Sequence, residues 1–159
     1  MNTIYLLLGS NQQNPQKQLS IAQKYIRKKI GAISRSSGIY QTAAWGNTQQ
    51  PDFLNQVIIA ETELPATVLM QSILEIEALM GRIRTKKYAP RIIDIDILFY
   101  NKDIIHTKGL DIPHPRIPER NFVLIPLNQL SPNFKHPGLH ITIHQLLINS
   151  ADTLTVKKF

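Results

Sequence analysis

The sequence contains no cysteine, few acidic residues and no long hydrophobic run. Without cysteine, the chain cannot form disulfides, use a thiol nucleophile or bind zinc through thiolates, and this composition fits a reducing compartment. The apolar run at residues 4–8 is too short, and lacks the basic flank, for a secretory signal. No segment approaches the roughly 18 apolar residues of a membrane-spanning helix. We therefore expect a cytoplasmic protein without a membrane partner.

Acidic residues are scarce: 11 Asp or Glu face 18 Lys or Arg, which gives a formal net charge of +7. This excess favours polyanionic partners, such as nucleic acid, membrane surfaces or phosphate-rich small molecules, and composition does not distinguish among them. A glycine-rich phosphate loop is also missing. Gly9-Ser10-Asn11 follows an apolar run but lacks the Gly-Lys-Ser/Thr of a P-loop. A phosphate site must then rest on cationic side chains and metal ions.

The hydrophobic pattern predicts one domain, residues 1–159, of the α+β class. Its first hundred residues have the order strand, helix, strand, strand, helix, strand. The predicted strands are 3–8, 33–41, 53–61 and 93–100, and the predicted helices run from Pro15 to Gly31 and from Pro65 to Gly81. This order predicts a ferredoxin-like βαββαβ core, with a mostly antiparallel sheet and both helices on one face. A short hairpin follows residue 101, and short helices are expected near 119–128 and 143–148.

Residues 93–97, Ile-Asp-Ile-Asp-Ile, carry the most informative pattern. Side chains alternate between the faces of a strand, so the isoleucines point into the core while Asp94 and Asp96 share the other face, with Cα atoms about 7 Å apart. Such carboxylates repel each other unless a cation intervenes, and Mg²⁺ takes one or two carboxylates together with phosphate and water. Alone, an Asp-x-Asp is more often the solvated side of an amphipathic strand.

A basic segment precedes this strand: residues 82–91 include five cations and no acid. Most such runs are solvated loops. Here the run is joined directly to the aspartates, and acids that hold metal beside a group of cations are what a triphosphate requires. Gly81 provides a hinge from which the segment can close over a ligand.

Two weaker patterns leave alternatives open. The histidines spaced by four at 136–144 suggest a zinc face, but Pro137-Gly138 rules out a helix there, which disfavours zinc. Trp45, Phe53 and Asn55 surround the start of the third predicted strand. Aromatics at such positions are usually core, whereas an amide beside aromatic faces also suits a flat heterocycle.

Taken in order, short motifs along the chain resemble the 6-hydroxymethyl-7,8-dihydropterin pyrophosphokinase family of the folate pathway. The match runs from Gly9 to about Gln145, and the ordered set is specific although no single motif is. The matching pieces are Gly9-Ser10-Asn11, Tyr40-x-Thr42, residues 50–55, Glu77-x-x-x-Gly81-Arg82-x-Arg84, Pro90-Arg91-x-x-Asp94-x-Asp96-Ile97, Pro113-His114-Pro115-Arg116 and Arg120-x-Phe122 through Leu127. The resemblance implies a three-layer αβα arrangement around the ferredoxin-like core, with extra C-terminal helices.

The resemblance also implies an ATP- and Mg²⁺-dependent enzyme that transfers pyrophosphate from ATP to the hydroxymethyl group of the pterin and releases AMP. Its partners would be ATP and a reduced pterin, without nucleic acid, and the enzyme would be a monomer. The implied catalytic residues are Arg82, Arg91, Asp94 and Asp96, the two aspartates holding two Mg²⁺ ions. ATP would contact Glu77, Arg82, Arg84, Arg91, Ile97, His114 and Arg120. The pterin would contact Thr42, Ala43, Ala44, Trp45, Phe53, Asn55, Tyr88 and Phe122.

Several positions depart from the family pattern. Tyr88-Ala89 replaces Trp-Gly in a loop one residue shorter, and residues 43–45 replace a Pro-Pro-Leu of some members. Leu74 stands where a Gln often occurs, and Gly109 and Asp111 stand where some members have Arg and Thr. These changes bear on the seal over the pterin and on ATP binding. None of them touches the aspartate pair.

Two rival functions are an RNA-binding module, because a basic βαββαβ domain is also the RRM pattern, and a regulatory small-ligand domain. An RNA-binding RRM needs aromatic and basic residues on its central strands, where this chain has Asp94 and Asp96, and no segment resembles the RNP1 motif. A regulatory small-ligand domain would bind nucleotide without releasing AMP. The pyrophosphokinase interpretation accounts for the aspartates and the basic segment together.

Overall fold

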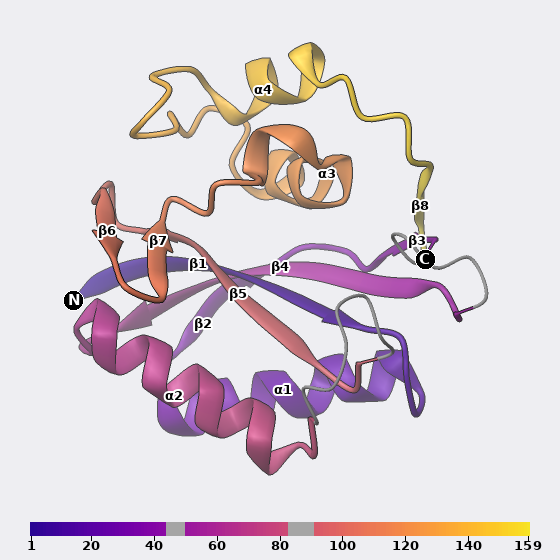
Figure 1. Ribbon diagram of the computed structural model, residues 1–159, viewed down its shortest axis with the longest axis vertical. Helices are drawn as coiled ribbons and strands as arrows, with labels where there is room; N and C mark the ends of the chain where they lie inside the picture. Colours follow the sequence, from indigo (N-terminus) through magenta and orange to yellow (C-terminus); the bar gives the residue numbers. More distant parts are fainter. Residues whose placement is uncertain (44–49, 83–90) are drawn as a thin grey trace.

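A computed structural model describes residues 1–43, 50–82 and 91–159, which form three layers (Figure 1). The elements, in chain order, are β1 (Asn2–Ser10), α1 (Pro15–Lys29), β2 (Ile33–Ser36), β3 (Tyr40–Thr42), β4 (Phe53–Thr62), α2 (Ala66–Leu79), β5 (Asp94–Tyr100), β6 (Ile105–Thr107), β7 (Leu110–Ile112), the 3-10 helix η1 (Ile117–Glu119), α3 (Asn121–Leu130), α4 (Ile143–Asn149) and β8 (Val156–Lys158). None of the helices in the described ranges has the length and apolar content needed to cross a membrane.

The main sheet is antiparallel with the strand order β5-β1-β4-β3-β8, and β2 pairs with β4 as well. Helices α1 and α2 cover one face, as expected for a ferredoxin-like core, while α3 covers the other face and α4 packs against α3 (Figure 1). The predicted fold class and its three layers are therefore confirmed. The covered second face also separates this architecture from an RRM, whose sheet is open to bind RNA bases.

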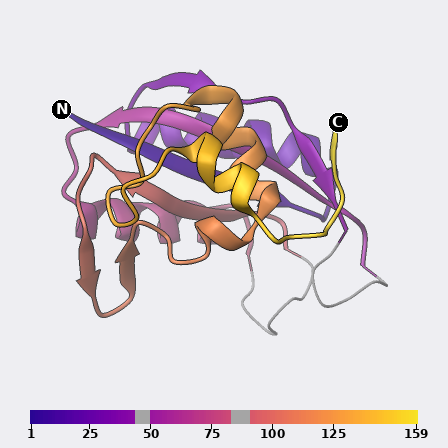
Figure 2. The same ribbon diagram turned by 90° about the horizontal axis from the view of Figure 1, so that it is seen from above.

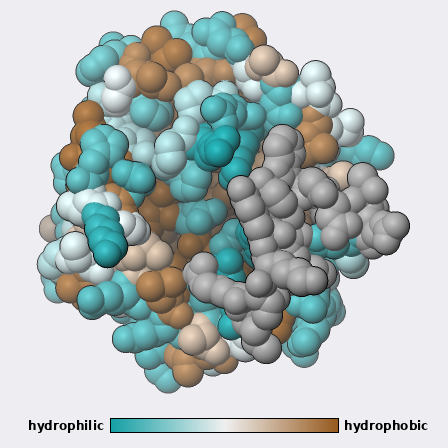
Figure 3. All heavy atoms as spheres, viewed as in Figure 1, coloured by the Kyte–Doolittle hydropathy of each residue, from teal (hydrophilic) through white to brown (hydrophobic). Residues whose placement is uncertain are grey.

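Side-chain alternation along the strands divides the apolar residues between two buried cores. The α1–α2 core includes Ile4, Leu6, Leu8, Leu19, Ile26, Ile58, Leu69, Ile73, Ile76, Ile93, Ile95 and Ile97. The α3–α4 core includes Tyr5, Leu7, Val57, Ile59, Leu98, Phe99, Val123, Leu124, Leu127, Ile143 and Leu146. Each fully buried Leu or Ile contributes about 1.5–3 kcal/mol. The face seen in Figure 3 is mostly hydrophilic, with hydrophobic residues in scattered groups.

The prediction of one continuous strand at 33–41 is wrong, because the structure has two strands there, β2 and β3. The Ser37 hydroxyl accepts the Val57 backbone N–H at 3.0 Å, and the Gly38 N–H donates to Gln129 of α3 at 2.9 Å. These side-chain partners interrupt the ladder to β4. The predicted hairpin after residue 101 is confirmed as β6 and β7.

The second half of the chain differs in detail from the prediction. The helix expected near 119–128 is a 3-10 turn followed by α3, which continues through Pro126 to residue 130. The helix expected at 143–148 is confirmed as α4, and a capping box between Thr142 and Gln145 begins it. Strand β8, at the end of the chain, was not predicted.

Candidate active site

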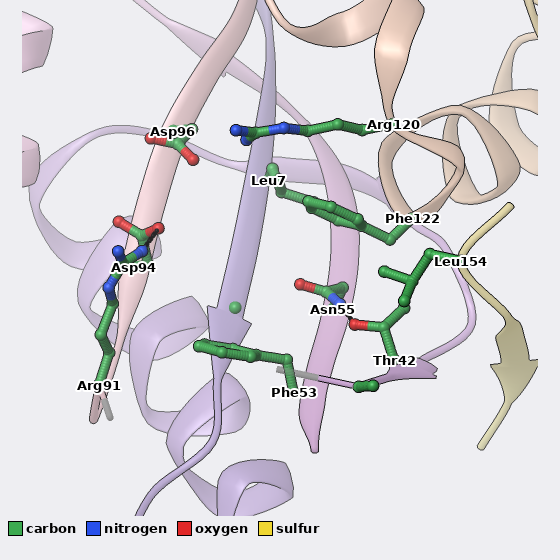
Figure 4. A pocket seen from close by; sticks show the side chains of 12 residues that line it. Leu7, Thr42, Phe53, Asn55, Arg91, Asp94, Asp96, Arg120, Phe122 and Leu154 are labelled. Atoms are coloured by element: carbon green, nitrogen blue, oxygen red, sulfur yellow. Dashed lines mark hydrogen bonds and ion pairs between the residues drawn. The ribbon is translucent and has the colours of Figure 1, made fainter. Parts of the chain in front are cut away.

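A pocket opens between the sheet and the start of α3, at the ends of β1, β4 and β5 (Figure 4). One end of the pocket is charged and the other is neutral. The charged end has Arg91, Asp94, Asp96 and Arg120, and the remaining lining residues are Leu7, Gly9, Thr42, Ala43, Phe53, Asn55, Phe122 and Leu154. Residues predicted for two different ligands therefore line one continuous pocket: Arg91 and Arg120 for ATP, and Thr42, Ala43, Phe53, Asn55 and Phe122 for the pterin.

Strand register places the two ends of the pocket on one level of the sheet. Gly9 of β1 pairs with Asn55 of β4 on one side and with Asp94 of β5 on the other. Leu7, two residues earlier, pairs with Asp96. A Cβ atom on Gly9 would lie 3.1 Å from the Asn55 Oδ1. The absence of a side chain at Gly9 therefore keeps the floor open between the amide and the first carboxylate.

Asp94 and Asp96 share the pocket-facing side of β5, as the alternation predicts (Figure 4). The isoleucines between and beside them are buried in the α1–α2 core. A β-bulge follows, where Tyr5 pairs with Phe99 but the next residue of β1 pairs with Ile97. Leu98 and Phe99 consequently both enter the α3–α4 core. The alternation that presents the aspartates thus holds up to the bulge and changes there.

Asp94 is paired with both ends of the basic segment. Arg82 Nη1 lies 2.7 Å from Asp94 Oδ1, and Arg91 Nη1 lies 2.8 Å from Asp94 Oδ2. The same Arg82 nitrogen lies 2.6 Å from Oε2 of the buried Glu77, which also accepts the Ile95 N–H at 2.9 Å. Burial alone would lower the pKa of Arg82, but Asp94 and Glu77 more than offset it, so that this pKa is raised.

Asp96 holds its proton far more tightly than an ordinary aspartate. Burial, followed by the negative charges of Asp94 and Glu77, raises its pKa to about 7, against the opposing charges of Arg120 and Arg91. Figure 4 shows Arg120 extending from the start of α3 toward Asp96. A cation that binds beside such a carboxyl stabilises its ionised form.

This donor set fits Mg²⁺. Asp94 and Asp96 supply hard oxygen ligands from one face, and phosphate and water complete the shell of such an ion. Within the described residues, no set of three His, Asp or Glu side chains gathers in a way that could hold a metal. This is what we expect of a Mg²⁺ site in which the protein supplies two carboxylates and the phosphates of a ligand supply further oxygens.

The neutral end combines aromatic rings with an amide. The Phe53 and Phe122 rings lie on two sides of Asn55 (Figure 4). Asn55 and Thr42 are each 4% exposed, and the Asn55 Nδ2 donates to the Thr42 Oγ1 at 3.2 Å. The guanidinium carbon of Arg120 lies 5.6 Å from the Phe122 ring centre. Phe53 and Asn55, whose role periodicity left open, therefore line the pocket in the arrangement that suits a flat heterocycle.

Four of the described residues predicted to contact ATP lie outside the pocket lining: Glu77 and Arg82, whose ion pair adjoins Asp94, and Ile97 and His114. The Ile97 side chain is buried in the α1–α2 core, so an approach to nucleotide there would involve its backbone. His114 donates its backbone N–H to Leu98 O at 3.1 Å, and its Nδ1 accepts the Arg116 N–H at 3.1 Å. Burial, and then the charge of Arg120, lowers the pKa of His114, so its imidazole is neutral at pH 7.

Other predicted positions lie outside the described residues or away from the pocket. Ala44, Trp45, Arg84 and Tyr88 fall outside the described residues. Leu74 is on the exposed side of α2. Gly109 has a φ of 78° between β6 and β7, and Asp111 Oδ1 lies 3.1 Å from His106 Nδ1. These three departures from the family pattern do not line the pocket.

Asn11 was part of a recognised motif but was not predicted to act at the site. It is 1% exposed, and its Nδ2 donates to Gln50 Oε1 at 2.9 Å and to Pro51 O at 3.2 Å. Its Oδ1 accepts the Arg91 N–H at 2.8 Å, and its own N–H donates to Arg91 O at 3.1 Å. Asn11 therefore fixes Arg91 relative to β1 and to the chain entering β4.

We expect Asn11→Ala to lower the free energy of unfolding by about 1–3 kcal/mol, because it removes several side-chain hydrogen bonds at once, including those to the Arg91 N–H and the Pro51 carbonyl. Urea denaturation measures this change. The neighbouring Gln12→Ala, at an exposed side chain, is the control and should stay within about 0.5 kcal/mol of the wild type. Equal stabilities of the two variants would contradict the role given to Asn11.

Comparisons with known proteins agree with this geometry. Residues 5–132 match the family described as 7,8-dihydro-6-hydroxymethylpterin-pyrophosphokinase (HPPK). A 2-amino-4-hydroxy-6-hydroxymethyldihydropteridine pyrophosphokinase of Aquifex aeolicus is 40% identical over 139 residues, 86% of this chain and 85% of that protein. The protein of the same name from Haemophilus influenzae is 35% identical over 158 residues, 99% of this chain and 98% of that protein.

Longer proteins match over part of their length. The chain is 39% identical over 148 residues to the folic acid synthesis protein FOL1 of Dictyostelium discoideum, and spans 22% of it. A crystal structure of Plasmodium falciparum HPPK-DHPS superposes with a TM-score of 0.76 at 20% identity, covering 93% of this chain and 43% of that one. The structural likeness supports the fold, and the sequence matches establish the kinship. The chain belongs to the 7,8-dihydro-6-hydroxymethylpterin-pyrophosphokinase family.

Proposed function

We propose that the chain transfers the pyrophosphoryl group of ATP to the hydroxymethyl oxygen of 6-hydroxymethyl-7,8-dihydropterin, in folate biosynthesis. The supporting observation is one pocket with Asp94 and Asp96 at a charged end and Asn55 at a neutral, aromatic end. In this reaction the hydroxymethyl oxygen bonds to the β-phosphorus of ATP. The bond from that phosphorus to the oxygen bridging the α-phosphate breaks, AMP leaves with that oxygen, and the hydroxyl proton is released.

The neutral end would hold the pterin. Phe53 and Phe122 would stack against the faces of the ring, since aromatic pairs stabilise such contacts by about 0.5–1.5 kcal/mol. Asn55 and Thr42 would hydrogen-bond to the ring edge, and Ala43 would contact it. Ala44, Trp45 and Tyr88, outside the described residues, stay predictions for the same ligand.

The charged end would hold the triphosphate. Two Mg²⁺ ions held by Asp94 and Asp96 would neutralise part of the phosphate charge and polarise the phosphates. Arg82 and Arg91 each carry five N–H donors, more than their ion pairs with Asp94 use, and would bind phosphate oxygens. Arg120, beside Asp96, would add positive charge near the transferred group. Arg84, Glu77, His114 and the Ile97 backbone stay predictions for the nucleotide.

The test is an AMP-release assay with ATP, Mg²⁺ and the reduced hydroxymethylpterin. We expect one AMP for each pterin consumed, and no turnover after chelation by EDTA or when the pterin is omitted. ADP as the product, or nucleotide binding without AMP release, would contradict the proposal and favour a regulatory small-ligand domain. We further propose a single-domain, cytoplasmic monomer, which size-exclusion chromatography with light scattering tests.

A further inference from the structure

The C-terminal strap, residues 150–159, returns from α4 to the sheet along one side of the molecule (Figures 1 and 2). Its residues alternate: Asp152, Leu154 and Val156 are half-buried, while Ala151, Thr153 and Thr155 are exposed. Such a period of two is typical of an extended segment with one face against the protein. The strap lies beyond residue 132, where the family match ends.

The first anchor of the strap is Asp152, which binds the start of α3. Its Oδ2 accepts the Asn121 backbone N–H at 2.8 Å, and its carbonyl accepts the Asn121 Nδ2 at 3.2 Å. Asn121 lies between Arg120 and Phe122, which both line the pocket. The strap is therefore connected to the helix that carries one wall of the pocket.

The second anchor is the pairing of β8 with β3. Val156 pairs with Thr42, and Lys158 pairs with Tyr40. The Phe159 N–H also donates to Ile39 O at 2.8 Å. The strap thus bridges α3 and the strand that carries Thr42, the two sides of the neutral end.

Leu154 lies between the two anchors, with its backbone N–H donating to Asp152 Oδ1 at 3.0 Å. Its side chain lines the pocket beside Thr42 and Asn55 (Figure 4). An apolar group at this position shields the amide and hydroxyl from water, and such bonds are stronger in a dry environment. The residue also limits the space at the end of the pocket farthest from the aspartates.

We propose that Leu154 contacts the edge of the bound heterocycle and sets the size of ring substituent that the site accepts, with Asp152 as its positioning residue. This inference rests on the proposed pyrophosphoryl transfer, since it identifies a wall of the same pocket. Removing the wall loses apolar contact with the ring and opens room for a larger one.

The experiment measures AMP release by Leu154→Ala with the reduced hydroxymethylpterin and with an analogue that carries an added ethyl group on the ring edge. We expect the KM for the pterin to rise about 10-fold, with the KM for ATP unchanged. The preference for the unsubstituted pterin, as the ratio of the two kcat/KM values, should fall about 10-fold or more. Thr155→Ala, at the adjacent exposed residue, is the control and should match the wild type.

Asp152→Ala tests the anchor separately. It should raise the KM for the pterin, as Leu154→Ala does, and increase hydrogen exchange of the Leu154 and Asn121 amides. Wild-type kinetics of Leu154→Ala for both pterins would overturn the inference while leaving the proposed function intact. Absence of AMP release by the wild-type protein would instead contradict the proposed function. In that case, calorimetry of pterin binding to wild type and to Leu154→Ala would still test the inference.

Discussion

Asp96→Ala should reduce the rate of AMP release about 10³-fold at saturating ATP and pterin, and Asp94→Ala should have an effect of similar size. Each substitution removes one of the two carboxylates expected to hold Mg²⁺, and the loss of charge stabilisation at a reacting group typically costs 10²–10³-fold. Asp94→Ala also leaves Arg82 and Arg91 without their shared partner. Initial rates at increasing Mg²⁺ measure both effects.

The matched controls are Asp103→Ala, at an exposed aspartate outside the pocket, and Lys86→Ala and Lys87→Ala in the basic segment. The first should turn over like the wild type, and the lysine variants should lose far less activity than the aspartate variants. Equal, mild losses across all five substitutions would contradict the assignment of the metal site to Asp94 and Asp96.

Asp96→Asn should stabilise the metal-free protein at pH 8 while destroying its response to Mg²⁺. The folded state raises the pKa of Asp96 from 3.8 to about 7, because of burial and then the charge of Asp94. Between these values the folded protein binds a proton that the unfolded chain has released, so stability decreases as pH rises toward 7. Each pKa unit corresponds to about 1.4 kcal/mol, and we expect a gain of about 1–3 kcal/mol in the variant.

Urea denaturation in EDTA at pH 5 and pH 8 measures this effect, with Asp103→Asn as the control. The difference between Asp96→Asn and wild type should be larger at pH 8, and Mg²⁺ with ATP should stabilise the wild type alone. A variant that is less stable than wild type at pH 8 would show that Arg120 and Arg91 outweigh burial in setting the ionisation of Asp96.

The sequence predicts those parts of the fold that depend on local pattern. Alternation and helical spacing locate the elements of the βαββαβ core, and the same alternation places Asp94 and Asp96 on one face. Strand β8 and the contact of Leu154 depend on pairing with β3, far away in sequence. The alternation Leu154-Thr-Val156-Lys is only a weak strand signal, because the pattern of so short a strand cannot be distinguished from that of a loop.

Side-chain partners account for the other differences. The break between β2 and β3 depends on Gln129, contributed by α3, which no pattern in residues 33–41 indicates. A bulge in β5 brings both Leu98 and Phe99 into the α3–α4 core. It likewise breaks an alternation that looks regular in a short stretch of sequence. Register across three strands, and not spacing within one, brings Gly9 into the pocket.

The position of Gly9 on β1, between β5 and β4, also fixes the distance between the two ends of the pocket. Asn55 and Asp94 lie one strand away on either side, so interstrand spacing separates their backbones by about 10 Å. Backbone hydrogen bonds hold that interval, and side-chain replacement elsewhere leaves it unchanged. A substrate whose ring lies at Asn55 would therefore have to bring its reacting group across this fixed distance toward Asp94, so the sheet would select substrates by length as well as by individual contacts.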